Sequence, residues 1–251
     1  MKRPPRFSQA SIDFIDQASR QKKKEWLEQN RGEYELVLVE PMREVMQKVE
    51  RALRGEAPGY LFPKRNFARI LRGAEGAMRH GPFRDWVGVA VSRKAKSRFE
   101  KPPSLYFHIS EDEGCFTAGG LYMSSADQTK HIRSWIDQDP TLIEELLEDR
   151  AFKKRYKEGL GREQVLKTKP RDYALDHPRI EWLKLSAFYV YREIKKKELF
   201  SADFADILIE DWRQILRLNE VLDRYTQNWP KTQVEQPVRQ ARPFLDDWDD
   251  K

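Results

Sequence analysis

The feature that most constrains the fold is a change in the spacing of apolar residues along the chain. Between residues 33 and 53, apolar side chains recur at steps of three and four, as on one face of an α-helix. From Phe83 to Met123 they alternate or run together, as in strands buried on one or both faces. The helical spacing returns between residues 201 and 223. A chain of this order is expected to bury its helix stripes against a sheet.

The predicted strands lie at residues 85–93, 104–111, 114–123 and 182–191. The first three follow one another through short connections, which favours antiparallel pairing. We therefore expect an α+β fold: a single domain with a mainly antiparallel sheet, covered by the long amphipathic helices at 33–53 and 201–223.

Three local signals predict where helices begin. Ser125 and Gln128 have the spacing of a capping box, and Asp139-Pro140 is typical of an N-cap followed by a first-turn proline. Pro41 lies on the first apolar stripe and is expected to kink or restart that helix.

Length and composition predict one domain and a tail. The 251 residues, 39% of them hydrophobic, are enough for a core over residues 7–225, whereas residues 226–251 are polar, proline-spaced and aperiodic, which is typical of a flexible tail. No segment approaches the roughly 18 apolar residues of a membrane span, and the basic start has no apolar run behind it. Cys115 is the single cysteine, so no internal disulfide can form. We expect a cytoplasmic protein that does not contact membranes.

The charge pattern permits anionic partners without requiring them. Lys and Arg number 47 against 41 Asp and Glu, which leaves a formal net charge of +6 spread over positions of both signs. Well-mixed charge often serves only to keep a protein soluble. An anionic ligand or a nucleic acid is therefore one open prediction for a partner.

Two basic clusters form the candidate anion-binding face: Lys64, Arg65, Arg69, Arg72, and, in the predicted hairpin loop at 93–101, Arg93, Lys94 and Lys96. Guanidinium groups bind phosphate and carboxylate through paired hydrogen bonds. If the first segment is helical, its arginines share one face. The alternative is that these residues pair internally, with carboxylates such as Glu75 or Asp85.

Asp176 and His177 are weak candidates for catalysis, because an acid beside a histidine can form part of a general-base pair. The sequence has no nucleophile turn to complete such a site, and an Asx-type turn before Pro178 is the favoured alternative. His80, His108 and His131 lack the spacing of metal ligands. We expect neither a metal nor another cofactor.

Several segments resemble a known family. The stretch KTKPRDYALDHPRIEWLKLSAF, residues 167–188, resembles the Lys/Arg-Pro-x-Gly-Tyr, Asp-His-Pro and Leu-Lys segments of the family called domain of unknown function 2461. Further matches over residues 7–225 are Phe14-Ile15, Trp26, Asn30, Tyr34, Pro41, Arg69 to Arg72, Gly119 to Tyr122 and Ile132-Arg133. The resemblance implies an α+β fold and no settled reaction.

The sequence departs from the family pattern in two places. After Arg72 the text GAEGAMRHGPFRDW lacks the acid and the threonine of the family, and Asp172 stands where the family usually has glycine. If the family has an active site at the arginine motif, this chain has lost or changed it.

Two function classes follow. The first is an intracellular binding module with a basic, anion-binding face for a phosphate-bearing or nucleic-acid partner. The alternative is a hydrolase or transferase that holds an anionic substrate with the same arginines and uses Asp176 or His177 for proton transfer. An enzyme requires these groups to converge in a pocket.

The C-terminal segment PFLDDWDDK places Phe244, Leu245 and Trp248 among four aspartates. Such a segment cannot bury its aromatic side chains alone, so three alternatives stay open: it is solvated, it docks on the basic face of its own domain, or it binds a protein partner.

Overall fold

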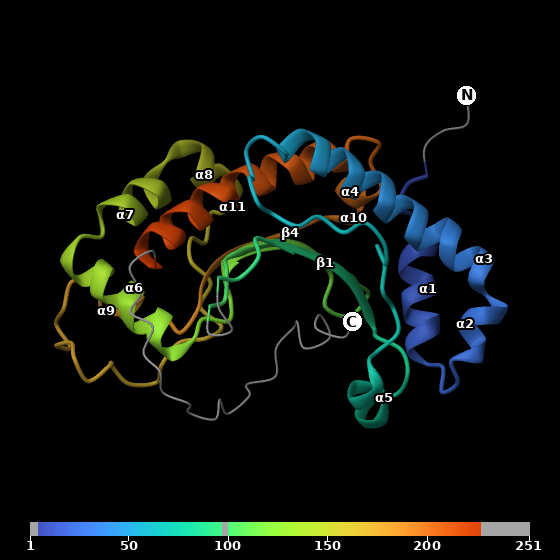
Figure 1. The fold of residues 1–251 in the computed structure, drawn as a ribbon, viewed down its shortest axis with the longest axis horizontal. Helices are drawn as coiled ribbons and strands as arrows, with labels where there is room; N and C mark the ends of the chain where they lie inside the picture. The colour runs from blue at the N-terminus through green and yellow to red at the C-terminus, as the bar shows by residue number, and fades with distance from the viewer. Residues whose placement is uncertain (1–4, 97–99, 227–251) are drawn as a thin grey trace.

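The computed structural model describes residues 5–96 and 100–226. Helices form an arch over a curved sheet (Figure 1). The elements are α1 (Gln9–Ser19), α2 (Glu25–Gln29), α3 (Arg31–Tyr34), the π-helical η1 (Glu35–Val39), α4 (Glu40–Leu53), α5 (Ala74–His80), β1 (Trp86–Ser92), β2 (Ser104–Ser110), β3 (Cys115–Leu121), α6 (Ala126–Gln138), α7 (Thr141–Glu148), α8 (Arg150–Arg155), α9 (Ile180–Leu183), β4 (Phe188–Glu193), α10 (Lys196–Leu199) and α11 (Phe204–Thr226).

The sheet has four strands in the order β1-β2-β3-β4, and every neighbouring pair is antiparallel. This arrangement confirms the predicted α+β fold. Phe107 on β2 pairs with Val89 on β1 and with Thr117 on β3, and Ala118 on β3 pairs with Tyr191 on β4. Because side chains alternate along a strand, this register decides which residues share a face.

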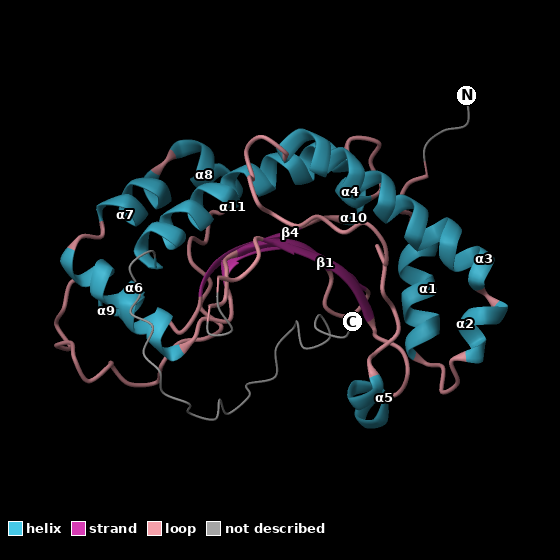
Figure 2. Cartoon of the chain, in the orientation of Figure 1, coloured by secondary structure: helices cyan, strands magenta, loops and turns pink. Residues whose placement is uncertain are grey.

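The two faces of the sheet differ in what covers them. On one face, the fully buried Trp212 of α11 donates a hydrogen bond from Nε1 to Thr117 Oγ1 at 3.0 Å. The ring of Phe107 lies 5.1 Å from that of Phe204 on the same face. Helices α4 and α11 run along this convex side, and the opposite face is the concave side of the arch (Figures 1 and 2). We call these the covered face and the concave face.

Gly119 allows α11 to approach the covered face closely. A Cβ atom at this position would lie 2.5 Å from the carbonyl oxygen of Ser104 and would also collide with Ile215. Real Cβ atoms do not come so close, so any side chain here would push the helix from the sheet.

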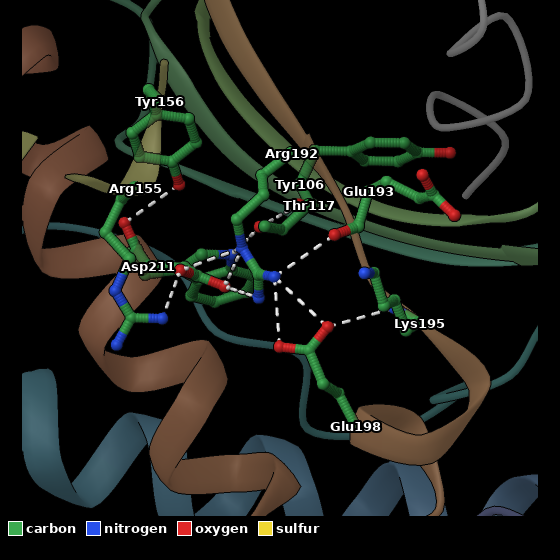
Figure 3. A network of polar contacts seen from close by, with 10 residues as sticks. Tyr106, Thr117, Arg155, Tyr156, Arg192, Glu193, Lys195, Glu198 and Asp211 are labelled. Carbon is green, nitrogen blue, oxygen red and sulfur yellow. Dashed lines mark hydrogen bonds and ion pairs between the residues drawn. The ribbon is translucent and has the colours of Figure 1, made fainter. Parts of the chain in front are cut away.

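A buried charged network joins β4 to α11 (Figure 3). The Asp211 carboxylate accepts hydrogen bonds from Arg192 Nη2 at 2.5 Å and from Arg155 Nη1 at 3.0 Å. Arg192 also donates to both oxygens of Glu198. Burial raises the pKa of Asp211, and the guanidinium groups of Arg192 and Arg155 oppose this shift. The network fixes α11 and α10 to the last strand.

Irregular segments accompany both edges of the sheet. Residues 60–72 run antiparallel to β1, with bridges from Tyr60 to Arg93 and from Leu71 to Phe83. Along β4, Gly161 N donates to the carbonyl oxygen of Tyr189 at 2.7 Å. Such cover leaves fewer backbone groups open to pairing with another chain.

Two of the predicted helix starts are confirmed, and the prediction of the last strand was partly wrong. Ser125 and Gln128 form the capping box of α6, and Pro41 lies in the first turn of α4, where the helix restarts after η1. The strand predicted from residue 182 begins only at Phe188, because residues 180–183 form the short helix α9. Leu183 is buried in this helix, and a short apolar run does not distinguish a buried strand from a helical turn.

The described helices include none that is both long and apolar enough to cross a bilayer. The predicted tail at 226–251, apart from Thr226, lies outside the described residues, as does Arg98 of the predicted basic loop.

Candidate functional site

The concave face holds a cavity of about 460 Å³ that is lined mainly by apolar atoms. Its aromatic lining comes from Tyr106, Phe116, Tyr122, Tyr189 and Tyr191, and its charged lining from Glu113, Glu163 and Glu193. The remaining lining residues are small: Ser104, Cys115, Ala118, Gly119 and Gly120. None of these lining residues is Lys or Arg.

The strand register explains the hollow. Tyr106 on β2, Ala118 on β3 and Tyr191 on β4 form one row across the sheet, so a small side chain lies between two large ones. In another row, Gly120 lies between Ser104 and Tyr189. Small residues on the third strand therefore make the floor, and tyrosines on its neighbours form the walls.

The three carboxylates reach the cavity from different segments. Glu193 ends β4, Glu113 lies in the turn between β2 and β3, and Glu163 belongs to the segment beside the β4 edge. A Glu113 oxygen lies 3.1 Å from His108 Nε2. Within residues 5–96 and 100–226, no Lys or Arg forms an ion pair with any of the three carboxylates.

Burial shifts the pKa values of three groups in or beside the cavity, Tyr106, Tyr189 and His108. It raises the pKa of Tyr106, and the nearby Glu113 carboxylate raises it further. It likewise raises the pKa of Tyr189, where Glu163 adds to the shift. Burial lowers the pKa of His108, so this imidazole is neutral at pH 7 despite the Glu113 contact. The charge of the cavity therefore comes from its carboxylates.

His108 connects two of the lining residues. Its Nδ1 lies 3.0 Å from the Tyr106 hydroxyl, and its ring stacks on Phe116 with centroids 4.5 Å apart. With Glu113 on the other ring nitrogen, the imidazole holds the Tyr106 side chain against the floor. A Cβ at Gly88 would lie 2.8 Å from the Tyr106 hydroxyl oxygen, so glycine makes room for this ring.

Three residues of the predicted basic face form internal ion pairs. Arg72 Nη2 lies 3.0 Å from Asp85, one of the two partners considered from the sequence. Arg93 binds Glu100 at 2.5 Å and Asp223 at 2.7 Å, and Lys64 pairs with Glu50. For these residues the geometry agrees with the internal-pairing alternative.

The remaining members of the basic face are spread along one edge of the sheet. Arg65, Lys94 and Lys96 are exposed and Arg69 is partly exposed. Residues 61–72 are not helical, so the condition for a shared arginine face is not met. Because Arg72 lies beside the start of β1 and Arg93 follows its end, the two are separated by roughly 25 to 30 Å at the strand rise per residue. Anion binding by these residues stays a prediction.

Asp176 and His177 do not form a pair with each other. His177 Nε2 lies 3.1 Å from Asp137 Oδ1, and its Nδ1 accepts a hydrogen bond from Arg179 N at 3.0 Å. Asp176 is exposed. Neither residue lines the cavity on the concave face.

The sequence interpretation missed the cavity. Its signal is the alternation of Tyr106 and His108 on one predicted strand and of Tyr189 and Tyr191 on another, which places polar aromatic side chains opposite the apolar face. Glu163 could not be found in this way, because the segment that carries it has no strand pattern.

Comparison with known proteins places the chain in a family. The family described as conserved hypothetical protein (DUF2461) matches residues 10–220. The chain belongs to this family. No curated protein and no solved structure matches it.

Several residues shared with the DUF2461 pattern have structural roles in this member. The Tyr34 hydroxyl donates to the carbonyl oxygen of Ala68 at 2.6 Å, and Arg133 Nη2 donates to that of Leu185 at 2.7 Å. Gly120 has a φ of 116°, which favours glycine, and with Tyr122 it lines the cavity. The divergent text after Arg72 forms the short helix α5.

Proposed function

We propose that this protein is a binding module that holds a small organic cation in the cavity of the concave face. The observation that carries the proposal is the composition of the cavity: an aromatic and apolar lining, three carboxylates, and no Lys or Arg among the described residues that line it. Positively charged ligands with apolar parts suit such a site, since aromatic faces attract cations and carboxylates accept hydrogen bonds from ammonium groups.

The charge of the whole chain makes this cavity unusual for the molecule. The formal net charge is +6, so long-range attraction does not favour cations. Any preference for a cation must therefore come from the local field of Glu113, Glu163 and Glu193. A desolvated cation over an aromatic face gains about 2 kcal/mol, and salt screens exposed carboxylates. Affinity is expected to weaken as salt rises.

The proposal is tested with three probes that share one ring: benzylammonium, benzyl alcohol and benzoate. Calorimetric titration at low salt is expected to show the order benzylammonium, then benzyl alcohol, then benzoate, because only the charge differs greatly between them. The variant Glu193→Gln removes one of the three cavity carboxylates and is expected to weaken benzylammonium binding by up to about twofold, because two carboxylates remain for a single ammonium group. Equal affinities for the cation and the alcohol, or tighter binding of benzoate, would contradict the proposal.

The matched control for this variant is Asp112→Asn. Asp112 is an exposed acid in the turn that also carries Glu113, and it is not a lining residue. The Asp112→Asn variant loses one negative charge, as Glu193→Gln does. The affinity of the Asp112→Asn variant for benzylammonium is expected to equal that of the unmodified protein.

The basic edge gives a second candidate function, which is the binding of an anionic partner. It is favoured by the exposure of Arg65, Lys94 and Lys96. Replacing all three with Ala is expected to weaken binding of a single-stranded oligonucleotide and to reduce its dependence on salt. If the triple variant binds the oligonucleotide as tightly as the unmodified protein, these three residues do not contribute to an anion-binding site. The hydrolase or transferase alternative gains no support, because neither the arginines nor Asp176 and His177 line the cavity.

A further inference from the structure

The carboxylates of the cavity stand at two ends of its floor. Glu193 pairs with Phe116 across β3 and β4, and Glu113 contacts His108, which is the partner of Phe116 on β2. One carboxylate therefore lies in the Phe116 row, and a second contacts a residue of that row. We call this the double-acid end.

Glu163 stands at the other end. Its segment joins β4 where Gly161 N donates to Tyr189 O, and Tyr189 is the partner of Gly120. Glu163 lies two residues after Gly161 and lines the cavity together with Tyr189. We call this the single-acid end.

The spacing of the two ends follows from the strand register. Phe116 and Gly120 are four residues apart on β3, which corresponds to about 13 Å at the rise of a strand. Between them lies the row of Tyr106, Ala118 and Tyr191, which holds no charged side chain. An uncharged floor thus separates two acidic ends.

We infer that the ligand of this cavity is a linear aliphatic diamine or polyamine, bound in its protonated form with one ammonium group at each acidic end. The inference rests on the proposed function and names its ligand class. An ammonium group donates up to three hydrogen bonds, which suits a carboxylate better than a quaternary group would. The methylene chain lies on Ala118 and the aromatic rings, where its apolar surface is removed from water.

Length is the property that this arrangement selects. A diamine that is too short reaches only one end, and one that is too long must bend at a cost in conformational freedom. Engaging both ends joins two weak contacts in one molecule, which raises affinity well above that of either contact alone. A monoamine of equal length has the same apolar chain and one charge only.

The test is a calorimetric titration with α,ω-diaminoalkanes of four to twelve carbons, with octylammonium as the one-charge control. The expected affinity passes through a maximum near 1,8-diaminooctane, which is expected to bind roughly tenfold more tightly than octylammonium. Circular dichroism and the melting temperature establish that each variant used below is folded.

Variants at the two ends sharpen the test. Glu163→Gln and, separately, the pair Glu113→Gln with Glu193→Gln are each expected to reduce the affinity for 1,8-diaminooctane to about that of octylammonium, roughly tenfold. Either change is expected to alter octylammonium binding by about twofold at most, because the other end remains. Asp112→Asn is the control and is expected to change neither affinity.

The outcomes separate the two proposals. Equal affinities for 1,8-diaminooctane and octylammonium, or an affinity that rises steadily with chain length, would overturn the diamine inference while leaving the cation proposal in place. A failure of every ammonium probe to bind would overturn both.

Discussion

The two faces of the sheet differ in whether their carboxylates have positively charged partners. On the covered face, the fully buried carboxylate of Asp211 is bound by Arg192 and Arg155, and the network extends to Glu198 (Figure 3). On the concave face, Glu113, Glu163 and Glu193 stand at a cavity without a Lys or Arg partner in the described chain.

This difference between the faces separates the residues that stabilise the fold from those that are available to a ligand. A buried charge without a partner is costly, so removing one member of the network on the covered face is expected to destabilise the fold strongly. Exposed carboxylates retain their water and cost little in the free protein. They can therefore serve a ligand, and the same sheet holds its helices with one face and offers a site with the other.

The largest effect is expected from Asp211→Ala on the covered face. The change removes the buried carboxylate that Arg192 and Arg155 share, so both guanidinium groups lose this ion-pair partner. The loss is expected to lower the free energy of unfolding by about 3 to 5 kcal/mol. Urea denaturation measures it. Glu193→Gln on the concave face is the counterpart, with an expected change within about 0.5 kcal/mol. Similar losses for both variants would break the contrast between the faces.

Gly119→Ala is expected to have the next largest effect. The new methyl group collides with Ile215 and approaches Ser104, so α11 must shift, at a cost of about 2 to 3 kcal/mol. Gly32→Ala is the matched control, because Gly32 is in α3 with no atom within 4 Å of an added Cβ. The control is expected to keep or raise stability, by up to about 1 kcal/mol. A tolerated alanine at Gly119 would show that the helix does not pack as closely as described.

Thr117→Val tests the hydrogen bond between Trp212 and the sheet. Valine keeps the shape but removes the acceptor of the indole N–H and the hydroxyl that donates to the carbonyl oxygen of Tyr106, which is expected to cost about 1 to 2 kcal/mol of unfolding free energy. The tryptophan fluorescence of the Thr117→Val variant is also expected to differ from that of the unmodified protein, because Trp212 loses this hydrogen bond. An unchanged unfolding midpoint would mean that the hydrogen bond contributes nothing to stability.

The smallest effect concerns acid stability. Arg217 and the amides of Ala151 and Phe152 lower the pKa of Asp149, the N-cap of α8, to about 2. A folded-state pKa below the ordinary value of 3.8 means that the carboxylate stabilises the fold above pH of about 4 and that this contribution is lost as the pH falls toward 2. Asp149→Asn is therefore expected to be less stable than the unmodified protein at pH 7 and equally stable near pH 2. Unfolding curves that differ equally at both pH values would contradict this pKa.

The covered face was more predictable from the sequence than the concave face. The apolar stripe of α11 and the strand alternation around Phe107 follow from spacing alone, because burial selects residues by periodicity. The partners of Arg72 and Arg93 include residues 13 and 130 positions away, and spacing carries no information on such contacts. The cavity likewise depends on strand register and on the course of the segment that carries Glu163. Lys64, Arg72 and Arg93 pair within the chain, as in the internal-pairing alternative, and these contacts could not be assigned from spacing.

The most direct test of cation binding in the cavity of the concave face is a map of ¹H–¹⁵N amide shifts during titration with benzylammonium and, separately, with benzoate. Benzylammonium is expected to perturb the amides of residues 104–106, 115–122 and 189–193, with little change at residues 61–72. Benzoate is expected to leave the cavity amides unperturbed. Shifts that appear with benzoate but not with benzylammonium, or that cluster on residues 61–72 and 93–96, would contradict cation binding in this cavity and would move the site to the basic edge.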